Sequence, residues 1–277
     1  MFYFAIPVLL FRSMAENELP EQIAWGYLLS YYAGVAVVWA IGMTVGRIAF
    51  GADPDRSTIH GMGAAFGNTV LLGIPLVLAS FGEAASLPLY LLLAFHSTIM
   101  YTAVTVLLEA ARGGGAQLRH LLLNAARSLA ANPILIGLVA GIVWNLAGLG
   151  VPGPIDRWMA LLSAAAVPCA LFSMGASLRA YRILGALPPA MVMIVLKLVV
   201  HPLLVLAFAT LVFDVPPLWT KVAVVLAALP VGVNVYLFGN RYGVGQAEAA
   251  TAILLSTIIS VATLSVLLLW LGVEGAT

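Results

Sequence analysis

The sequence carries very little charge. Lysine, arginine, aspartate and glutamate make up 8% of the 277 residues, whereas a typical soluble domain has about 25%. Hydrophobic residues make up 63%, and the mean hydropathy is +1.09. The 12 basic residues are scattered singly between apolar runs, so we expect no nucleic-acid partner. This composition indicates a polytopic membrane protein.

Cysteine is almost absent. Cys169 is the only one, and it lies within an apolar run. A single cysteine excludes an intrachain disulfide and any cluster of thiolate metal ligands. We expect Cys169 to be a small buried apolar side chain.

The common signatures of enzymes are also missing. Gly113-Gly114-Gly115 is followed by Ala and Gln, rather than by the Lys and Ser or Thr of a phosphate-binding loop. No Asp lies within an apolar run, which argues against a membrane aspartyl protease, and His96 beside Ser97 has no evident orienting partner. We therefore expect no enzyme activity, no cofactor and no metal site.

Apolar runs follow one another along the whole chain. A bilayer crossing takes about 20 mostly apolar residues. No period-2 pattern is present, so helices are expected rather than a barrel. The nine predicted spans are 1–15, 24–46, 60–81, 87–108, 132–150, 158–178, 184–212, 217–239 and 247–272.

Apart from Arg157, which follows Asp156, the basic residues between these spans fall in every second loop. The basic loops hold Arg47 and Arg56, then Arg112, Arg119 and Arg127, then Arg179 and Arg182, and finally Arg241. Because cytoplasmic loops carry an excess of Lys and Arg, we expect a protein of the cell membrane. Its N-terminus would be cytoplasmic and its C-terminus extracellular or periplasmic.

One pentapeptide pattern occurs twice, as Pro7-Val8-Leu9-Leu10-Phe11 and as Pro168-Cys169-Ala170-Leu171-Phe172. The predicted orientation makes the first copy run outward and the second inward, which is an inverted repeat, an architecture of secondary transporters. We divide the chain into a first repeat at 1–110, a cytoplasmic linker at 111–130 and a second repeat at 131–277. The basic amphipathic stretch 118–129 predicts an interfacial helix in the linker.

Alignment of the two copies pairs two interrupted apolar spans, around 67–75 and 229–236. Proline frees a carbonyl group, glycine permits unwinding, and asparagine supplies donors and an acceptor. Paired interruptions point to a substrate site, and ordinary proline kinks are the alternative. The candidate substrate-binding residues are Asn68, Thr69, Pro75, Pro230, Asn234 and Tyr236.

Other polar residues at membrane depth are weaker candidates. Lys197 and His201 are four residues apart on one helix face, so Lys197 could attract an anion and His201 could carry a proton. A lysine that snorkels to the interface is the alternative. A second polar patch could line a cavity and contains His96, Ser97 and Tyr101.

Acidic residues at the ends of the spans are interpreted differently. Glu109 and Glu248 lie near span ends, and we expect both to be solvated carboxylates.

The sequence resembles the auxin efflux carrier family, which includes bacterial malonate and malate transporters and the plant PIN-FORMED proteins. The resemblance covers the whole chain. It is carried by residues 5–11, by Phe66-Gly67-Asn68-Thr69 with Gly73-Ile74-Pro75-Leu76, by Asn132-Pro133-Ile134-Leu135, by 166–175, by 197–202, and by Ala228-Leu229-Pro230 with Asn234.

The resemblance implies inverted five-helix repeats, a bile-acid-symporter-like fold, two crossing broken helices and an elevator mechanism. It divides the chain into a scaffold, about 1–22 plus 131–178, and a transport core, about 23–110 plus 184–272. The scaffold is often dimeric, so a homodimer is expected. Family members have ten spans, and by that measure the first helix of the first repeat is missing here.

The function we expect is a secondary active or potential-driven carrier of a small organic anion, malonate-like, malate-like or auxin-like. Coupling to a proton or to sodium stays open. The alternatives are an anion channel and a truncated membrane protein that does not transport.

Overall fold

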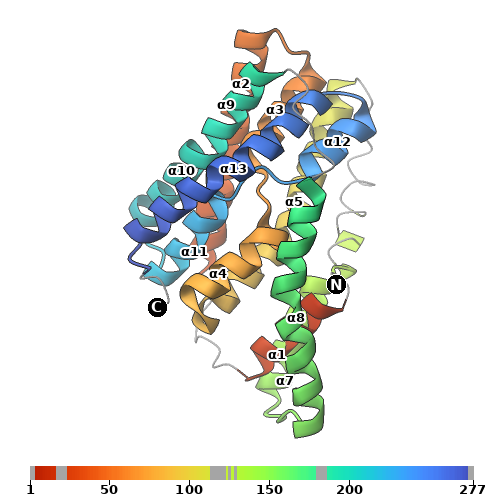
Figure 1. Ribbon diagram of the computed structural model, residues 1–277, viewed down its shortest axis with the longest axis vertical. Helices are drawn as coiled ribbons and strands as arrows, with labels where there is room; N and C mark the ends of the chain where they lie inside the picture. Colours follow the sequence, from red (N-terminus) through yellow and green to blue (C-terminus); the bar gives the residue numbers. More distant parts are fainter. Residues whose placement is uncertain are drawn as a thin grey trace. The chain divides into compact units, whose positions relative to one another are not determined.

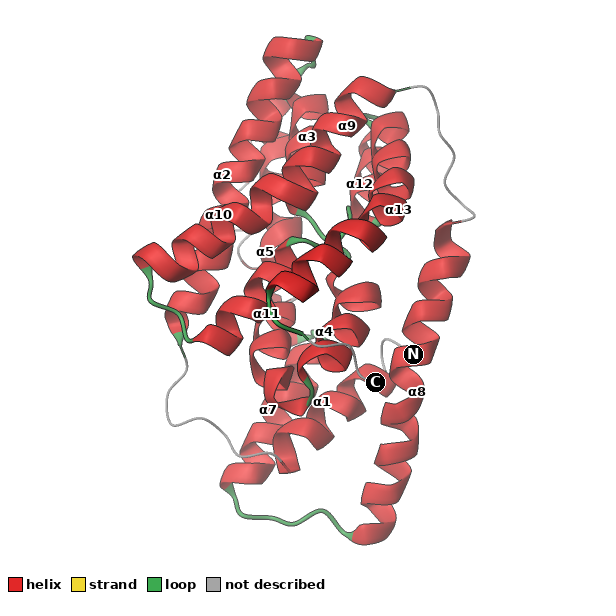
Figure 2. Cartoon of the chain, turned by 60° about the vertical axis from the view of Figure 1, so that its left-hand side comes forward, coloured by secondary structure: helices red, strands yellow, loops and turns green. Residues whose placement is uncertain are grey.

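The protein is helical throughout the part that the structure describes. That part of the computed structural model comprises residues 4–16, 24–112, 123, 126–127, 130–178 and 186–273. Within it every regular element is a helix (Figure 2), and the only strand-like pairing is an isolated bridge between Gly67 and Val231. The prediction of an all-α protein is confirmed. Most of the predicted linker 111–130, including most of its interfacial helix, lies outside the described residues.

Five helical segments in the described residues are long and apolar enough to cross a membrane. They are Trp25–Phe50, Glu83–Ala111, Gly153–Ser173, Leu187–Val212 and Gln246–Trp270. Three shorter apolar helices are Thr69–Phe81, Pro133–Leu146 and Pro217–Ala227. These helices agree with the prediction of several membrane spans, whereas the count of nine stays a prediction.

The chain forms two compact units. Unit 1 consists of Met1–Ile23, Val70–Thr102 and Gln117–Gly175. Unit 2 consists of Ala24–Thr69, Ala103–Ala116 and Ala176–Thr277. Two long helices, α5 (Ser86–Ala111) and α8 (Gly153–Leu178), run from one unit into the other.

In unit 1, two glycines bring helices α1 (Ala5–Glu16) and α7 (Pro133–Leu146) into close contact. A Cβ atom on Gly137 would fall 2.6 Å from the carbonyl oxygen of Pro7, and one on Gly141 would fall 2.6 Å from that of Phe11. Small residues four positions apart are the usual means by which membrane helices approach closely. The first copy of the repeated pentapeptide therefore packs on α7.

Polar side chains at the end of α1 also hold unit 1 together. Arg12 forms ion pairs with Asp156 at 2.6 Å and with Glu16 at 3.3 Å. The Ser13 hydroxyl donates a hydrogen bond of 3.0 Å to Glu83. Three separate parts of the sequence therefore meet at this end of α1.

The prediction that Cys169 is buried is wrong. Cys169 is exposed on α8, next to Pro168 inside the same helix. A membrane helix is apolar on all sides, so apolar neighbours in the sequence do not tell which side faces other helices.

In unit 2, helix α2 (Trp25–Phe50) packs closely along α3 (Pro54–Ala65). A Cβ atom on Gly42 would lie 2.9 Å from the Cα atom of Gly61. Helix α3 begins at Pro54, which suits the first turn of a helix. The Ser57 and Thr58 hydroxyls donate to the Pro54 carbonyl group.

The other helices of unit 2 come from the second half of the chain. The segment Leu187–Val212 consists of α9 (Leu187–Val195), η3 (Leu196–Val200), α10 (His201–Ala207) and η4 (Phe208–Val212). It is followed by α11 (Pro217–Ala227), α12 (Asn234–Tyr242) and α13 (Gln246–Trp270). Helix α11 contacts both α10 and α13 (Figure 1).

Candidate functional site

Two helices of unit 2 are interrupted at the places that the sequence predicts. Helix α3 ends at Ala65, and the chain is extended at Phe66 before η1 (Thr69–Gly73) leads into α4 (Ile74–Phe81). Helix α11 ends at Ala227, and α12 begins at Asn234. We call residues 66–69 and 228–234 together the junction.

The two interruptions are joined by backbone hydrogen bonds. The Asn68 amide donates to the Pro230 carbonyl oxygen at 3.0 Å, and the Gly232 amide donates to the Phe66 carbonyl oxygen at 2.8 Å. The Val231 amide donates to the Ser256 hydroxyl of α13 at 3.0 Å. Non-helical backbone at membrane depth must find such partners inside the protein. The two interruptions thus form one hydrogen-bonded structure and are not simple kinks.

Lys197 lies against both interruptions. Its side chain is fully buried, and its ammonium group donates to the Ala227 carbonyl oxygen at the end of α11. A Cβ atom on Gly67 would lie 3.2 Å from the Lys197 Nζ atom. The C-terminal end of a helix favours a cation. Because the side chain is buried, the snorkelling alternative does not hold.

The charge of Lys197 is not neutralised by an acidic side chain. Among the described residues, the ion pairs involve other cations and none joins Lys197 to a carboxylate. Its polar contacts are the Ala227 carbonyl group and His201, whose Nδ1 atom lies 3.3 Å from Nζ. The His201 ring packs edge-on against Tyr31, with ring centroids 5.4 Å apart. The Lys197 amino group therefore lies beside the junction, with no carboxylate among the described residues to pair with it.

The structure brings most of the predicted substrate-binding residues together at the junction. Asn68, Thr69 and Pro230 are buried there, and Asn234 starts helix α12. Tyr236 follows in the first turn of α12 and is partly exposed.

The remaining predicted residues belong to unit 1. Pro75 is buried in the first turn of α4, and His96 is buried in α5. Ser97 and Tyr101, also on α5, are half-buried. Their part in a site stays a prediction.

The prediction that Glu248 is solvated is wrong. Glu248 lies in the first turn of α13 and is 3% exposed. Its carboxylate pairs with Arg56 of α3, whose Nε atom lies 2.6 Å away. The His60 Nε2 atom lies 3.8 Å from the same carboxylate oxygen. Sequence reasoning missed this cluster because 192 positions separate Arg56 from Glu248.

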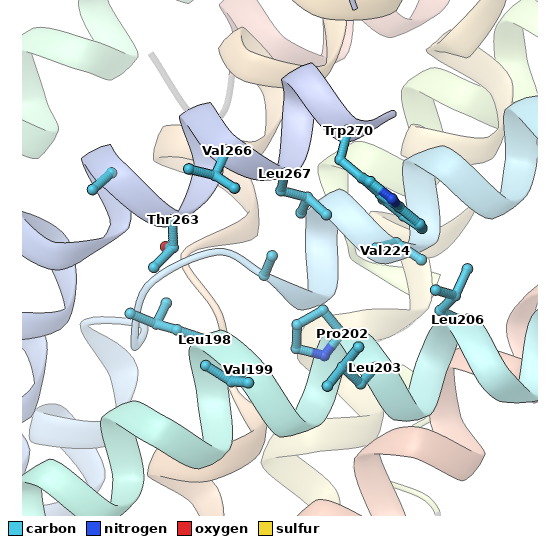
Figure 3. Close-up of a pocket in the computed structure, with 12 residues that line it drawn as sticks. Leu198, Val199, Pro202, Leu203, Leu206, Val224, Thr263, Val266, Leu267 and Trp270 are labelled. Carbon is cyan, nitrogen blue, oxygen red and sulfur yellow. The ribbon is translucent and has the colours of Figure 1, made fainter. Parts of the chain in front are cut away.

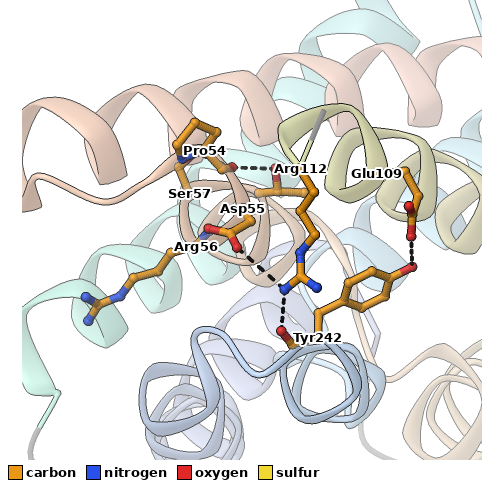
Figure 4. A network of polar contacts seen from close by, with 8 residues as sticks. Pro54, Asp55, Arg56, Ser57, Glu109, Arg112 and Tyr242 are labelled. Carbon is orange, nitrogen blue, oxygen red and sulfur yellow. Dashed lines mark hydrogen bonds and ion pairs between the residues drawn. The ribbon is translucent and has the colours of Figure 1, made fainter. Parts of the chain in front are cut away.

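A second polar network joins the outer ends of the interrupted helices (Figure 4). Arg112 donates to the Tyr242 carbonyl oxygen, pairs with Asp55 at 3.6 Å and lies 5.0 Å above the Tyr242 ring. The Tyr242 hydroxyl donates to Glu109 at 3.1 Å. Partial burial raises the pKa of this hydroxyl above its ordinary value, and the bond to Glu109 acts in the same direction. The network ties the end of α5 to the start of α3 and the end of α12.

A groove of about 520 Å³ lies among α10, α11 and α13 (Figure 3). Its walls include Pro202, Leu203, Val224 and Val266, and the polar side-chain atoms of its lining are the Thr263 hydroxyl and the Trp270 indole N–H. The groove offers no charged group to a carboxylate, so it does not compete with the junction as an anion site.

Taken with the membrane-spanning helices, the junction defines a multi-pass membrane protein whose polar site is built on unwound helix segments. The comparisons with known proteins agree. The family described as "Membrane transport protein" matches residues 1–268. The chain belongs to the auxin efflux carrier family of membrane transport proteins, as the sequence motifs predict.

Several relatives match almost the whole chain. A "Putative malonate transporter" of Rhizobium meliloti (strain 1021) is 33% identical over 267 residues, which are 96% of this chain and 83% of that protein. "Auxin efflux carrier component 8" of Arabidopsis thaliana is 27% identical over 311 residues, covering 94% of this chain and 84% of that protein. An "Uncharacterized transporter" of Methanothermobacter thermautotrophicus is 26% identical over 275 residues, with 94% and 83% covered.

Proposed function

We propose that this chain is a secondary carrier that moves a small organic anion across the cell membrane. The anion is a carboxylate of the malonate or malate type or an auxin-like acid. The name of the Rhizobium relative supports malonate as the first compound to test. The driving force is either the membrane potential or a coupled ion.

The observation that carries the proposal is the junction with Lys197 beside it. Helical structure resumes at Thr69 and at Asn234, so two helix N-terminal ends start there, and such ends favour negative charge. Lys197 places its amino group, which carries a positive charge when protonated, at the same place. Asn68 and Asn234 supply amide donors of the kind that orient a carboxylate. Half-helix ends at an interruption are the usual anion sites of secondary transporters.

The family resemblance supplies the mechanism that we propose. Two inverted five-helix repeats would form a bile-acid-symporter-like fold in which the interrupted helices cross. The transport core, about 23–110 plus 184–272, would move as a rigid body against the scaffold, about 1–22 plus 131–178, in a homodimer. His96, Ser97 and Tyr101 would line the path of the anion, and Pro75 would complete the site.

Counterflow in proteoliposomes tests this function. Purified protein is reconstituted with unlabelled malonate inside, and entry of radiolabelled malonate, malate and monocarboxylates is followed. A carrier shows saturable uptake that rises with unlabelled anion on the far side. Single-channel currents without counterflow would instead identify an anion channel, and no flux for any acid would contradict transport of these anions.

A further inference from the structure

His60 is a buried histidine that the proposed anion site does not use. It lies on α3 and is 3% exposed. Its Nδ1 side faces α2, because a Cβ atom on Gly46 would fall 2.6 Å from that nitrogen. Its ring is edge-on to Phe50, with centroids 6.4 Å apart. Its Nε2 atom points toward the Glu248 carboxylate, 3.8 Å away.

One partner of the Glu248 carboxylate reaches the surface. The Glu248 side chain is 3% exposed, but its partner Arg56 is 48% exposed. Figure 4 shows the Arg56 side chain pointing away from Arg112 and Asp55, so it does not join that network. The buried carboxylate is therefore linked to the surface of the unit through Arg56.

Few other charged groups face His60. On α2, Arg47 bonds to the Ser57 hydroxyl at 3.3 Å, and α9 carries no titratable side chain. Lys197, which belongs to η3, lies beside Gly67, just beyond the C-terminal end of α3. Tyr242 and Arg241 of α12 stack on each other. The charged groups nearest to His60 are thus the Glu248 carboxylate and the Arg56 guanidinium group that pairs with the same oxygen.

We propose that His60, facing Glu248, is the proton-binding site that couples anion transport to the proton gradient. Histidine is the side chain that changes charge between about pH 5 and 8. His60 Nε2 lies 3.8 Å from the Glu248 carboxylate, which also pairs with Arg56, whereas His201 Nδ1 lies 3.3 Å from the Lys197 amino group. The electrostatic environment therefore favours His60 over His201.

The proton site is connected to the junction by two helices. Helix α3 carries His60 and runs directly to Phe66 at the junction. Helix α13 carries Glu248, and it also carries Ser256, which accepts from Val231 at the junction. Protonation of His60 changes the contact between these two helices, and both hold the junction. Symport then requires that the unit crosses the membrane with both the anion and the proton bound, or with neither.

This inference rests on the proposed function, so its test separates the two. Radiolabelled malonate is added outside proteoliposomes that contain the wild-type protein. The outside is one pH unit more acidic than the inside, and the membrane potential is held at zero. A pH-sensitive dye reports the pH inside the proteoliposomes. One proton per anion permits about tenfold accumulation, with acidification of the lumen. Counterflow at equal pH is measured in the same preparation.

The variant His60→Gln keeps an amide donor toward Glu248 but cannot exchange a proton. We expect it to lose the gradient-driven accumulation while it still exchanges labelled for unlabelled malonate. Glu248→Gln is the second variant and should also lose accumulation. Asn240→Gln, at an exposed position on α12, is the control and should behave as wild type.

Each outcome decides one claim. Wild-type counterflow without gradient-driven accumulation overturns the proton coupling and leaves the carrier intact. Accumulation that persists in His60→Gln overturns the assignment to His60. Absence of wild-type counterflow with malonate and the other acids overturns the proposed carrier function and, with it, this inference.

Discussion

Lys197 is the single residue on which the anion site depends most. A buried ammonium group is expensive in an apolar interior unless it is paired. Here only a backbone carbonyl group and a histidine face it among the described residues. A buried amino group without an acidic partner is suited to a ligand that brings negative charge, because such a ligand stabilises its protonated form.

Lys197→Met should therefore weaken anion binding without unfolding the protein, because methionine fills a similar volume and removes the buried charge. A hydrogen bond to a charged group contributes about 1.5–3 kcal/mol, so KM for the transported anion should rise roughly 10- to 100-fold. Initial rates of counterflow across a concentration series measure this. An unchanged KM in a folded variant would remove Lys197 from the site.

Gly232 is the second critical residue, for steric reasons. A Cβ atom there would fall 2.5 Å from the Phe66 Cδ1 atom and 2.9 Å from the Gly67 carbonyl oxygen. Gly232→Ala should lower the free energy of unfolding by about 1–3 kcal/mol, the usual cost of overpacking. Thermal unfolding in detergent measures this loss of stability. Gly175→Ala on α8, where no atom lies within 4 Å, is the control and should leave the melting temperature unchanged or slightly higher.

Helix α13 acts as a support for the junction. Its Ser256 hydroxyl accepts from the Val231 amide at 3.0 Å, and its Glu248 holds Arg56 of α3. Both interrupted helices are therefore attached to one continuous helix.

Ser256→Ala should destabilise the protein, because it leaves a buried backbone amide without its acceptor. Such a loss costs about 1–3 kcal/mol. Ser265→Ala removes an equivalent hydroxyl from an exposed position on the same helix and should have little effect. Equal melting temperatures for the two variants would show that Ser256 does not hold the junction.

The elements around the site were predictable from the sequence where the signal is local. Proline, glycine and asparagine mark the interruptions at 67–75 and 229–236 because they act on their own stretch of backbone. The backbone pairing of Asn68 with Pro230, and the pairing of Arg56 with Glu248, join distant segments. No local pattern encodes such contacts. The predictions of burial for Cys169 and Glu248 were wrong for the same reason. Both residues lie in apolar spans, yet Cys169 is exposed and Glu248 is buried.

For the whole molecule, the family and the helical membrane architecture agree with the sequence. The orientation of the termini, the inverted repeats and the homodimer remain predictions, because they depend on how the chain is inserted and assembled. The central claim is narrower: a small carboxylate binds at the junction and is carried across the membrane.

Malonate counterflow in the double variant Asn68→Ala, Asn234→Ala tests that claim most directly. Asn240→Ala, at an exposed asparagine on the same helix as Asn234, is the matched control. We expect saturable counterflow in the wild type and in the control, and none in a double variant that is still folded and inserted. Wild-type counterflow in the double variant would contradict the account, because it would place the substrate away from the junction.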